Sequence, residues 1–317
     1  MTKTAQRHLN VSELQYGLPY SKGLTASRIM ATGLAPARAF HVAEVVEDRL
    51  REMGGPLVGA ELDALLLEVL RREVGERYAA SFSKWQLVLR LDMPLVVLIG
   101  GAPGVGKSTI ATMLANRLGV TRVIPTDAIR EVMRAMFSED IMPTLHTSSY
   151  DAARLVRHPL PRSADPVLIG FGEQASAVAV GVEALMSRAA AEGTDLIVEG
   201  AHVVPGFLDQ TRFEGRAVVV PVVVTVDDEE QHRGHFLMRA HEARHRPSER
   251  YLDFFENIRK QQKYVKSLAL EHGVPIVPSN NLDATLARVI DLVFNQAVGA
   301  VPPQAEPRPA ASKRGAR

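Results

Sequence analysis

The sequence feature that most constrains the fold is a glycine-rich stretch at residues 101–108 (GAPGVGKS), which fits the pattern G-x-x-x-x-G-K-[ST]. The apolar run at residues 94–100 precedes it and is typical of a buried parallel strand. Residues 107–118 follow with apolar side chains at helical spacing, and Gly119 is placed to end that helix. A strand, a glycine loop and a helix in this order predict a nucleotide-binding loop.

The chemistry of such a loop assigns roles to its residues. Small residues let backbone N–H groups surround phosphate oxygens, and the N-terminus of the following helix adds a favourable dipole. Lys107 is expected to reach the β- and γ-phosphates as a catalytic residue, and the Ser108 hydroxyl to ligate Mg²⁺. ATP and Mg²⁺ are therefore the expected cofactors. The expected nucleotide-binding residues are Gly101, Ala102, Pro103, Gly104, Val105, Gly106, Lys107, Ser108 and Thr109.

The composition is that of a globular protein, with 46% of the 317 residues hydrophobic and 23% charged. The length allows two domains. A net charge of +1 provides no basic field for nucleic acid. The chain has no cysteine and no apolar signal core near residue 1, so we expect a cytoplasmic protein without disulfides or thiolate metal sites. The longest apolar runs are of strand length, and no membrane span is expected.

Hydrophobic periodicity divides the chain into a helical part and an α/β part. We expect a flexible N-terminus at 1–15, a helical domain at 16–91, an α/β domain at 92–298 and a disordered tail at 299–317. Expected helices of the first part are 21–32, 36–53, 60–74 and 76–90, which form either a small domain or a cap packed on the next one.

The α/β part predicts a parallel five-stranded sheet with helices on both faces. Expected strands are 94–100, 121–125, 194–198, 217–226 and 274–278, and expected helices are 107–118, 169–193, 251–272 and 284–294. Pro221 falls inside the fourth strand, where it would remove a ladder hydrogen bond. We therefore expect a bulge or an edge position there.

Carboxylates follow the second and third expected strands, at the sheet edge where functional residues gather. Asp127 is placed to orient an acceptor hydroxyl, accept its proton or hold a Mg²⁺ water, and Arg130 to meet an anionic substrate. The alternative is an N-cap aspartate with a surface arginine. Glu199 ends an apolar strand as a Mg²⁺-holding carboxylate does. His202, in the same turn, is a functional group or a hydrogen-bonded loop histidine.

Two further segments are rich in polar and basic residues. In residues 141–167 the hydroxyl, histidine and arginine side chains suit a phosphorylated acceptor, and an ordinary polar surface insertion is the alternative. The candidate substrate ligands there are His146, Ser148, Ser149 and Tyr150. Residues 231–250 carry five arginines, which are typical of a lid that closes over phosphates or, alternatively, of a solvated basic helix. The preferred catalytic lid residues are Arg239, Arg244 and Arg246, and the scarcity of aromatic stacking residues in this segment argues against nucleic-acid binding.

The N-terminal region resembles an ATP-cone, a small regulatory nucleotide-binding module. The resembling residues are 18–29 (LPYSKGLTASRI) and 31–34 (ATGL), followed by helices and Tyr78 at a fitting spacing. The resemblance implies that Lys22 and Arg28 contact nucleotide phosphate. A cone that serves only for packing is the other interpretation.

Over residues 16–297 the chain resembles the archaeal-type 2-phosphoglycerate kinases. The resembling segments are the glycine loop, 126–134 (TDAIREVMR), 145–150 (LHTSSY), 170–171 with Gln174, 198–206 (VEGAHVVPG) and the arginine-rich segment into 250–252. The resemblance implies ATP-dependent phosphorylation of a hydroxyl of 2-phosphoglycerate to give 2,3-bisphosphoglycerate.

Residue chemistry alone reaches a P-loop kinase of a small phosphorylated acceptor, and other functions stay open. Inositol phosphates are an alternative acceptor, and a non-catalytic ATP/ADP sensor is an alternative class. A kinase of nucleic-acid ends or nucleotide sugars is a third, which the near-neutral charge disfavours for nucleic acid. Self-association into a homo-oligomer is also left open.

Overall fold

A computed structural model describes residues 21–53, 60–89, 91–157, 159–242 and 248–299. The expected flexible N-terminus at 1–15 lies outside the described residues, as does the expected disordered tail at 299–317 except for Gly299, which is helical. The expected lid also falls in part on residues 243–247, which the structure does not describe.

The centre of the molecule is a five-stranded sheet in the order β2-β3-β1-β4-β5, with every neighbouring pair parallel. The strands are β1 Leu95–Gly100, β2 Val123–Pro125, β3 Leu196–Gly200, β4 Val218–Thr225 and β5 Ile276–Pro278. The register sets Gly100 opposite both Gly200 and Val223, so the carboxyl ends of three strands share one edge. The predicted parallel five-stranded sheet is confirmed.

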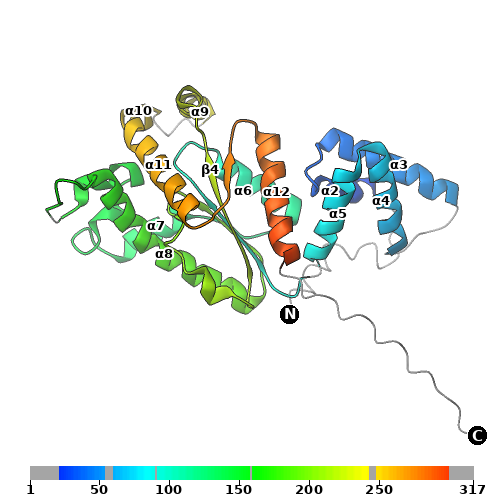
Figure 1. Cartoon of the computed structure of the whole chain (residues 1–317), viewed down its shortest axis with the longest axis horizontal. Coiled ribbons are helices and arrows are strands. Elements are labelled where there is room, and N and C mark those ends of the chain that lie inside the picture. The colour runs from blue at the N-terminus through cyan, green and yellow to red at the C-terminus, as the bar shows by residue number, and fades with distance from the viewer. Residues whose placement is uncertain (1–20, 54–59, 90, 158, 243–247, 300–317) are drawn as a thin grey trace, which may run out of the picture.

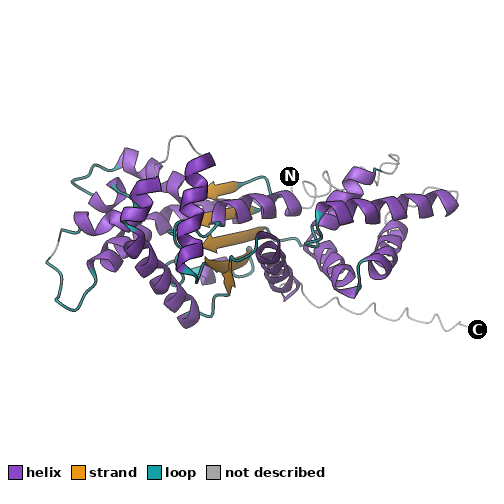
Figure 2. Cartoon of the chain, turned by 90° about the horizontal axis from the view of Figure 1, so that it is seen from above, coloured by secondary structure: helices purple, strands orange, loops and turns teal. Residues whose placement is uncertain are grey.

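Helices cover both faces of this sheet, as Figures 1 and 2 show. On one face lie α6 (Lys107–Leu118) and α12 (Leu282–Gly299), and on the other lie α7 (Thr126–Met136), α8 (Pro166–Glu192) and α11 (Phe255–Glu271). Side chains of β1 alternate between the two sides: Val97 joins the α6 and α12 cluster, whereas Leu98 joins the α8 cluster. All six residues of β1 are buried, which explains the continuous apolar run.

Among the described residues, α8 is the one helix whose length and apolar composition would also suit a membrane span. In the fold it lies on the sheet, and Phe171, Val178 and Val182 are buried in the core. The length of this helix therefore reflects the face that it covers.

The N-terminal helices are α2 (Lys22–Met30), α3 (Pro36–Met53), α4 (Ala60–Glu73) and α5 (Glu76–Leu89), close to the expected ranges. The Ser21 hydroxyl caps α2 by accepting from the Leu24 N–H at 3.3 Å. This group of helices packs on the α6 and α12 side of the sheet, where α5 lies against α12 (Figure 1). Its apolar residues and those of the sheet form one continuous cluster.

Pro221 was expected to mark a bulge or an edge position, and the structure has no bulge there in the pairing of β4 with β1. β4 lies between β1 and β5, and its register with β1 runs unbroken through the Pro221–Leu98 pair. The Val223 N–H donates to the Pro275 carbonyl beside β5, and the nitrogen of a residue two positions earlier faces the same side. Because β5 begins only at Ile276, opposite Val223, no strand within the described part of the chain lies beside Pro221 on that side. No ladder bond is lost.

The connection after β4 holds α9 (Glu229–Glu242) and α10 (Ser248–Asp253), and the segment before α8 holds the 3-10 helices η2 (Pro143–His146) and η3 (Ser149–Leu155). The prediction of one helix over 251–272 is wrong. Phe254 leaves helical geometry, with φ −102° and ψ 16°, and separates α10 from α11. The centroid of its ring lies 5.5 Å from that of Tyr150.

Candidate active site

The glycine loop lies at the carboxyl edge of the sheet, between β1 and α6. Gly101 and Gly104 have φ angles of 140° and 83°, which L residues with side chains rarely adopt. A Cβ at Gly101 would overlap the Val224 carbonyl oxygen, and one at Gly104 would overlap the Phe236 ring. Glycine is therefore required at both positions by backbone geometry and by close neighbours.

Lys107 and Ser108 form the first turn of α6, as predicted. The buried Lys107 Nζ donates to the Ala102 carbonyl at 2.8 Å, so the side chain folds over its own loop. The Ser108 hydroxyl donates to the Glu199 carboxylate at 2.8 Å. Glu199 stands in register with Ile99, which brings the ends of β1 and β3 together. These two oxygen groups are hard ligands of the kind that Mg²⁺ prefers.

Asp127 lies in the first turn of α7, directly after β2. Its carboxylate is 79% exposed and lies 3.8 Å from the Arg130 Nε. Arg130 is mostly buried, and its guanidinium donates to the Leu145 carbonyl at 2.8 Å and to the Glu131 carboxylate at 2.5 Å. Arg130 therefore fastens α7 to η2, while Asp127 remains open to an incoming group.

A buried chain of hydrogen bonds links β3 to the segment before α8. His202 contacts the Thr126 hydroxyl through Nδ1 and the Gln174 side-chain oxygen through Nε2, each at 2.9 Å. The amide nitrogen of Gln174 donates to the carbonyls of Thr144 and Thr147. The Gln174 oxygen must then accept, so Nε2 of His202 carries the proton and Nδ1 accepts from Thr126.

Burial keeps His202 neutral. The imidazole is fully buried, and this lowers the pKa of His202 from 6.5 to about 4, with the charge of Asp127 opposing the shift. The histidine that the sequence left undecided thus joins the Asp127 end of α7 to the 144–147 backbone.

The side chains predicted to bind an acceptor within 146–150 are largely engaged inside the protein. His146 Nε2 lies 2.8 Å from the Phe137 carbonyl. Ser149 is buried, and its backbone carbonyl, not its side chain, accepts from Gln261 at 2.7 Å. The Tyr150 ring is buried 5.6 Å from that of Tyr251, and burial raises the pKa of the Tyr150 hydroxyl.

Ser148 completes this segment and hydrogen-bonds the Tyr150 side chain. Sequence reasoning missed the neighbouring Asp151, a buried carboxylate that lies 3.0 Å from Arg154 and 3.6 Å from Arg250 of α10. Its only sequence signal was an acidic residue among the basic side chains of residues 141–167. Asp151 joins the end of the arginine-rich connection to the candidate acceptor segment.

The expected lid arginines stay a prediction. Arg239 lies in α9, but its side chain is not described, and Arg244 and Arg246 fall outside the described residues. The described part of α9 instead places two histidines against the glycine loop. His232 Nε2 lies 2.8 Å from the Pro103 carbonyl, and His235 Nδ1 lies 2.9 Å from the Gly104 carbonyl. Sequence reasoning assigned no role to either histidine.

The basic residues implied to bind nucleotide in the N-terminal helices have carboxylate partners. Lys22 pairs with Glu44 at 3.3 Å. Arg28 pairs with Asp63 at 2.5 Å and lies over the rings of Phe82 and Trp85. These contacts hold helices together and favour the packing interpretation of this module.

Comparison with known proteins finds close matches along nearly the whole chain. The chain is 35% identical over 291 residues to "2-phosphoglycerate kinase" of Methanopyrus kandleri, covering 92% of this chain and 88% of that protein. It is 38% identical over 282 residues to the protein of the same name from Methanothermobacter thermautotrophicus, covering 88% and 92%.

A gluconokinase structure from Sinorhizobium meliloti aligns with a TM-score of 0.35 and 16% identity, covering 65% of this chain and 93% of that one. No protein-family model matches the chain.

Proposed function

The chain belongs to the 2-phosphoglycerate kinase family, and from this premise we propose that it transfers the γ-phosphoryl group of ATP to the free hydroxyl of 2-phosphoglycerate. One observation in the fold carries the proposal: the loop residue Ser108 meets Glu199 at the sheet edge where Asp127 also emerges. A phosphate-binding loop, a pair of hard oxygen ligands and an open carboxylate are what phosphoryl transfer to a hydroxyl requires.

Phosphate binding falls to the loop and to the first turn of α6. Backbone N–H groups of the loop surround the phosphates, and the N-terminus of α6 adds its dipole. Lys107 exchanges the Ala102 carbonyl for the β- and γ-phosphate oxygens, since both are acceptors within reach of one flexible side chain. In the transition state this ammonium group balances charge on the transferred group.

Ser108 and Glu199 are the residues that would hold Mg²⁺, because both present oxygen atoms and lie 2.8 Å apart. The bound ion would supply positive charge that shields the phosphates from one another. Glu199 is almost wholly buried, so its carboxylate is held in place for that purpose.

We assign the acceptor side to Asp127. Its exposed carboxylate orients the acceptor hydroxyl and takes its proton as the new phosphate ester bond forms and the bond to ADP breaks. Arg130 keeps Asp127 in place and adds positive charge near the acceptor. The segment with His146, Ser148, Ser149 and Tyr150 forms the adjoining wall, and Arg239, Arg244 and Arg246 are proposed to close over the phosphates.

A turnover assay with a panel of acceptors tests this proposal. We expect ADP formation that requires Mg²⁺ and 2-phosphoglycerate, and little with 3-phosphoglycerate or inositol phosphates. Lys107→Ala should reduce kcat by at least about a hundredfold while the protein stays folded. Turnover with an inositol phosphate alone would replace the acceptor, and tight ATP binding without turnover would favour a sensor.

The location of the protein and its self-association are also proposals. We propose a cytoplasmic location because the acceptor is a small phosphorylated acid and the chain has no cysteine. Self-association remains a proposal that light scattering at two protein concentrations would decide.

A further inference from the structure

The helix α9 supports the glycine loop from outside. His232 is fully buried and lies 2.8 Å from the Pro103 carbonyl through Nε2, and His235, partly buried, lies 2.9 Å from the Gly104 carbonyl through Nδ1. Phe236, one position further, fills the space beside Gly104. Three residues of one helix thus contact two consecutive residues of the loop.

Each histidine contacts a peptide carbonyl, and this contact sets the direction of the N–H on the other side of the same peptide group. A peptide group is planar and trans, so its C=O and N–H bonds point in opposite directions. The Pro103 carbonyl shares a plane with the Gly104 N–H, and the Gly104 carbonyl shares one with the Val105 N–H. Holding both carbonyls at α9 therefore turns both N–H groups away from α9.

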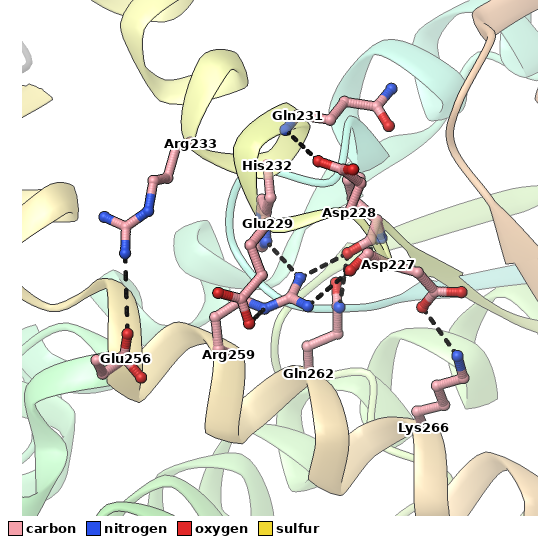
Figure 3. Close-up of polar contacts among 11 residues, drawn as sticks. Asp227, Asp228, Glu229, Gln231, His232, Arg233, Glu256, Arg259, Gln262 and Lys266 are labelled. Carbon is pink, nitrogen blue, oxygen red and sulfur yellow. Dashed lines mark hydrogen bonds and ion pairs between the residues drawn. The ribbon is translucent and has the colours of Figure 1, made fainter.

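The proton position on His232 follows from its second neighbour. Arg259 Nη1 lies 3.3 Å from His232 Nδ1, and an arginine can only donate. Nδ1 therefore accepts from Arg259 (Figure 3), and Nε2 carries the proton and donates a hydrogen bond to the Pro103 carbonyl. Burial lowers the pKa of His232 to about 4, so the ring stays neutral near pH 7 and keeps this arrangement.

The same arginine fixes the place where α9 begins. Arg259 donates to the carbonyls of Val226 and Asp227 at 2.7 and 2.8 Å, and Gln262 pairs with both backbone groups of Val226 at 3.1 and 2.8 Å. Lys266 pairs with Asp227 at 2.8 Å. Figure 3 shows this row of α11 side chains pointing at the β4–α9 connection. These contacts fix the start of α9 and therefore the position of His232.

We propose that His232 and His235 are positioning residues that hold the Gly104 and Val105 N–H groups toward the ATP phosphates, with Arg259 fixing the tautomer of His232. This role rests on the proposed function, because it takes the loop as the site of ATP. It deepens that function by making the start of α9 part of the nucleotide site.

The test compares two replacements of His232, one that cannot donate a hydrogen bond and one that can. His232→Phe keeps an aromatic ring between Phe236 and Phe255 but donates no hydrogen bond. His232→Gln places an amide donor near the original Nε2. We expect MgATP to bind about tenfold more weakly to the Phe variant by calorimetry, and the Gln variant to recover to within about threefold of wild type. The KM for ATP should rise in parallel, whereas the KM for the acceptor should not.

The matched control is His272→Phe, because His272 is exposed at the end of α11, where its ring lies beside Gly206. It should bind MgATP like wild type. If His232→Phe does not fold, His235→Phe provides the test, since His235 is only partly buried and holds the adjacent carbonyl.

Unchanged ATP affinity in a folded His232→Phe or His235→Phe variant would overturn the proposal, as would equal losses for the Phe and Gln variants. A purely structural role would lower the unfolding midpoint and leave the Kd of the folded fraction unchanged. Because ATP binding is measured without an acceptor, failure of 2-phosphoglycerate as substrate is a separate result.

Discussion

At the scale of single residues, two buried histidines have proton positions that their neighbours determine. His202 accepts from Thr126 and donates to Gln174, and His232 accepts from Arg259 and donates to the loop. In both cases a neighbouring group fixes the tautomer, because the Gln174 side-chain oxygen can only accept and the Arg259 guanidinium can only donate. Each histidine thereby connects a segment of the candidate site to a helix. Each ring must remain neutral to accept one hydrogen bond and donate the other.

That neutrality predicts loss of stability in acid. The pKa of His202 is lowered from 6.5 to about 4 by burial. The unfolded chain regains the ordinary value, so between these pH values it binds more protons than the folded chain, and stability falls as the pH falls. We expect His202 alone to account for about 2 kcal/mol between pH 7 and pH 5. Urea titrations of wild type and His202→Gln should show a smaller acid loss in the variant, and equal losses would contradict the assignment.

The open carboxylate of Asp127 gives a second residue-scale prediction. Asp127→Asn keeps the size of the side chain but cannot accept a proton, so kcat should fall by about a hundredfold or more. ATP affinity should change by less than about threefold, because Asp127 lies on α7 and not on the loop. Steady-state kinetics and calorimetry separate these quantities. A loss confined to ATP affinity would make Asp127 a nucleotide or metal ligand instead.

At the scale of elements, the N-terminal helices act as a packed cap. Arg28 lies between Asp63 and the rings of Phe82 and Trp85, whereas the Lys22 pairs are exposed. We expect Arg28→Ala to lower the free energy of unfolding by about 2 kcal/mol. Lys22→Ala, the matched control, should leave the urea midpoint unchanged. Calorimetry should give one ATP per chain, and a second site lost in both variants would instead assign nucleotide binding to this cap.

Element positions were largely predictable because they depend on local patterns. Apolar runs predicted the strands, and glycines predicted helix ends. Gly119 and Gly193, for example, both end helices in a left-handed conformation. Pro221 predicted a bulge or an edge position, and β4 is unpaired with β5 at this residue because β5 begins only opposite Val223. The break at Phe254 had no local signal, and the ring of Phe254 contacts Tyr150, a residue distant in sequence.

At the scale of the whole molecule, some residues of the candidate site were predictable from the sequence and others were not. Lys107, Ser108 and Glu199 were predictable because a motif and a strand-end rule place them at one edge. The inward packing of Tyr150 was not, because composition does not say which way a side chain faces. The contact of His232 with Pro103 joins residues 129 positions apart and has no motif.

The measurement that tests the central claim most directly is phosphorus NMR of the complete reaction with MgATP and 2-phosphoglycerate. We predict that ATP is converted to ADP while a second phosphate ester signal appears on the acceptor in equal amount. Lys107→Ala should produce neither signal on the same timescale. Formation of ADP with inorganic phosphate alone, or no consumption of ATP by folded protein, would contradict the account.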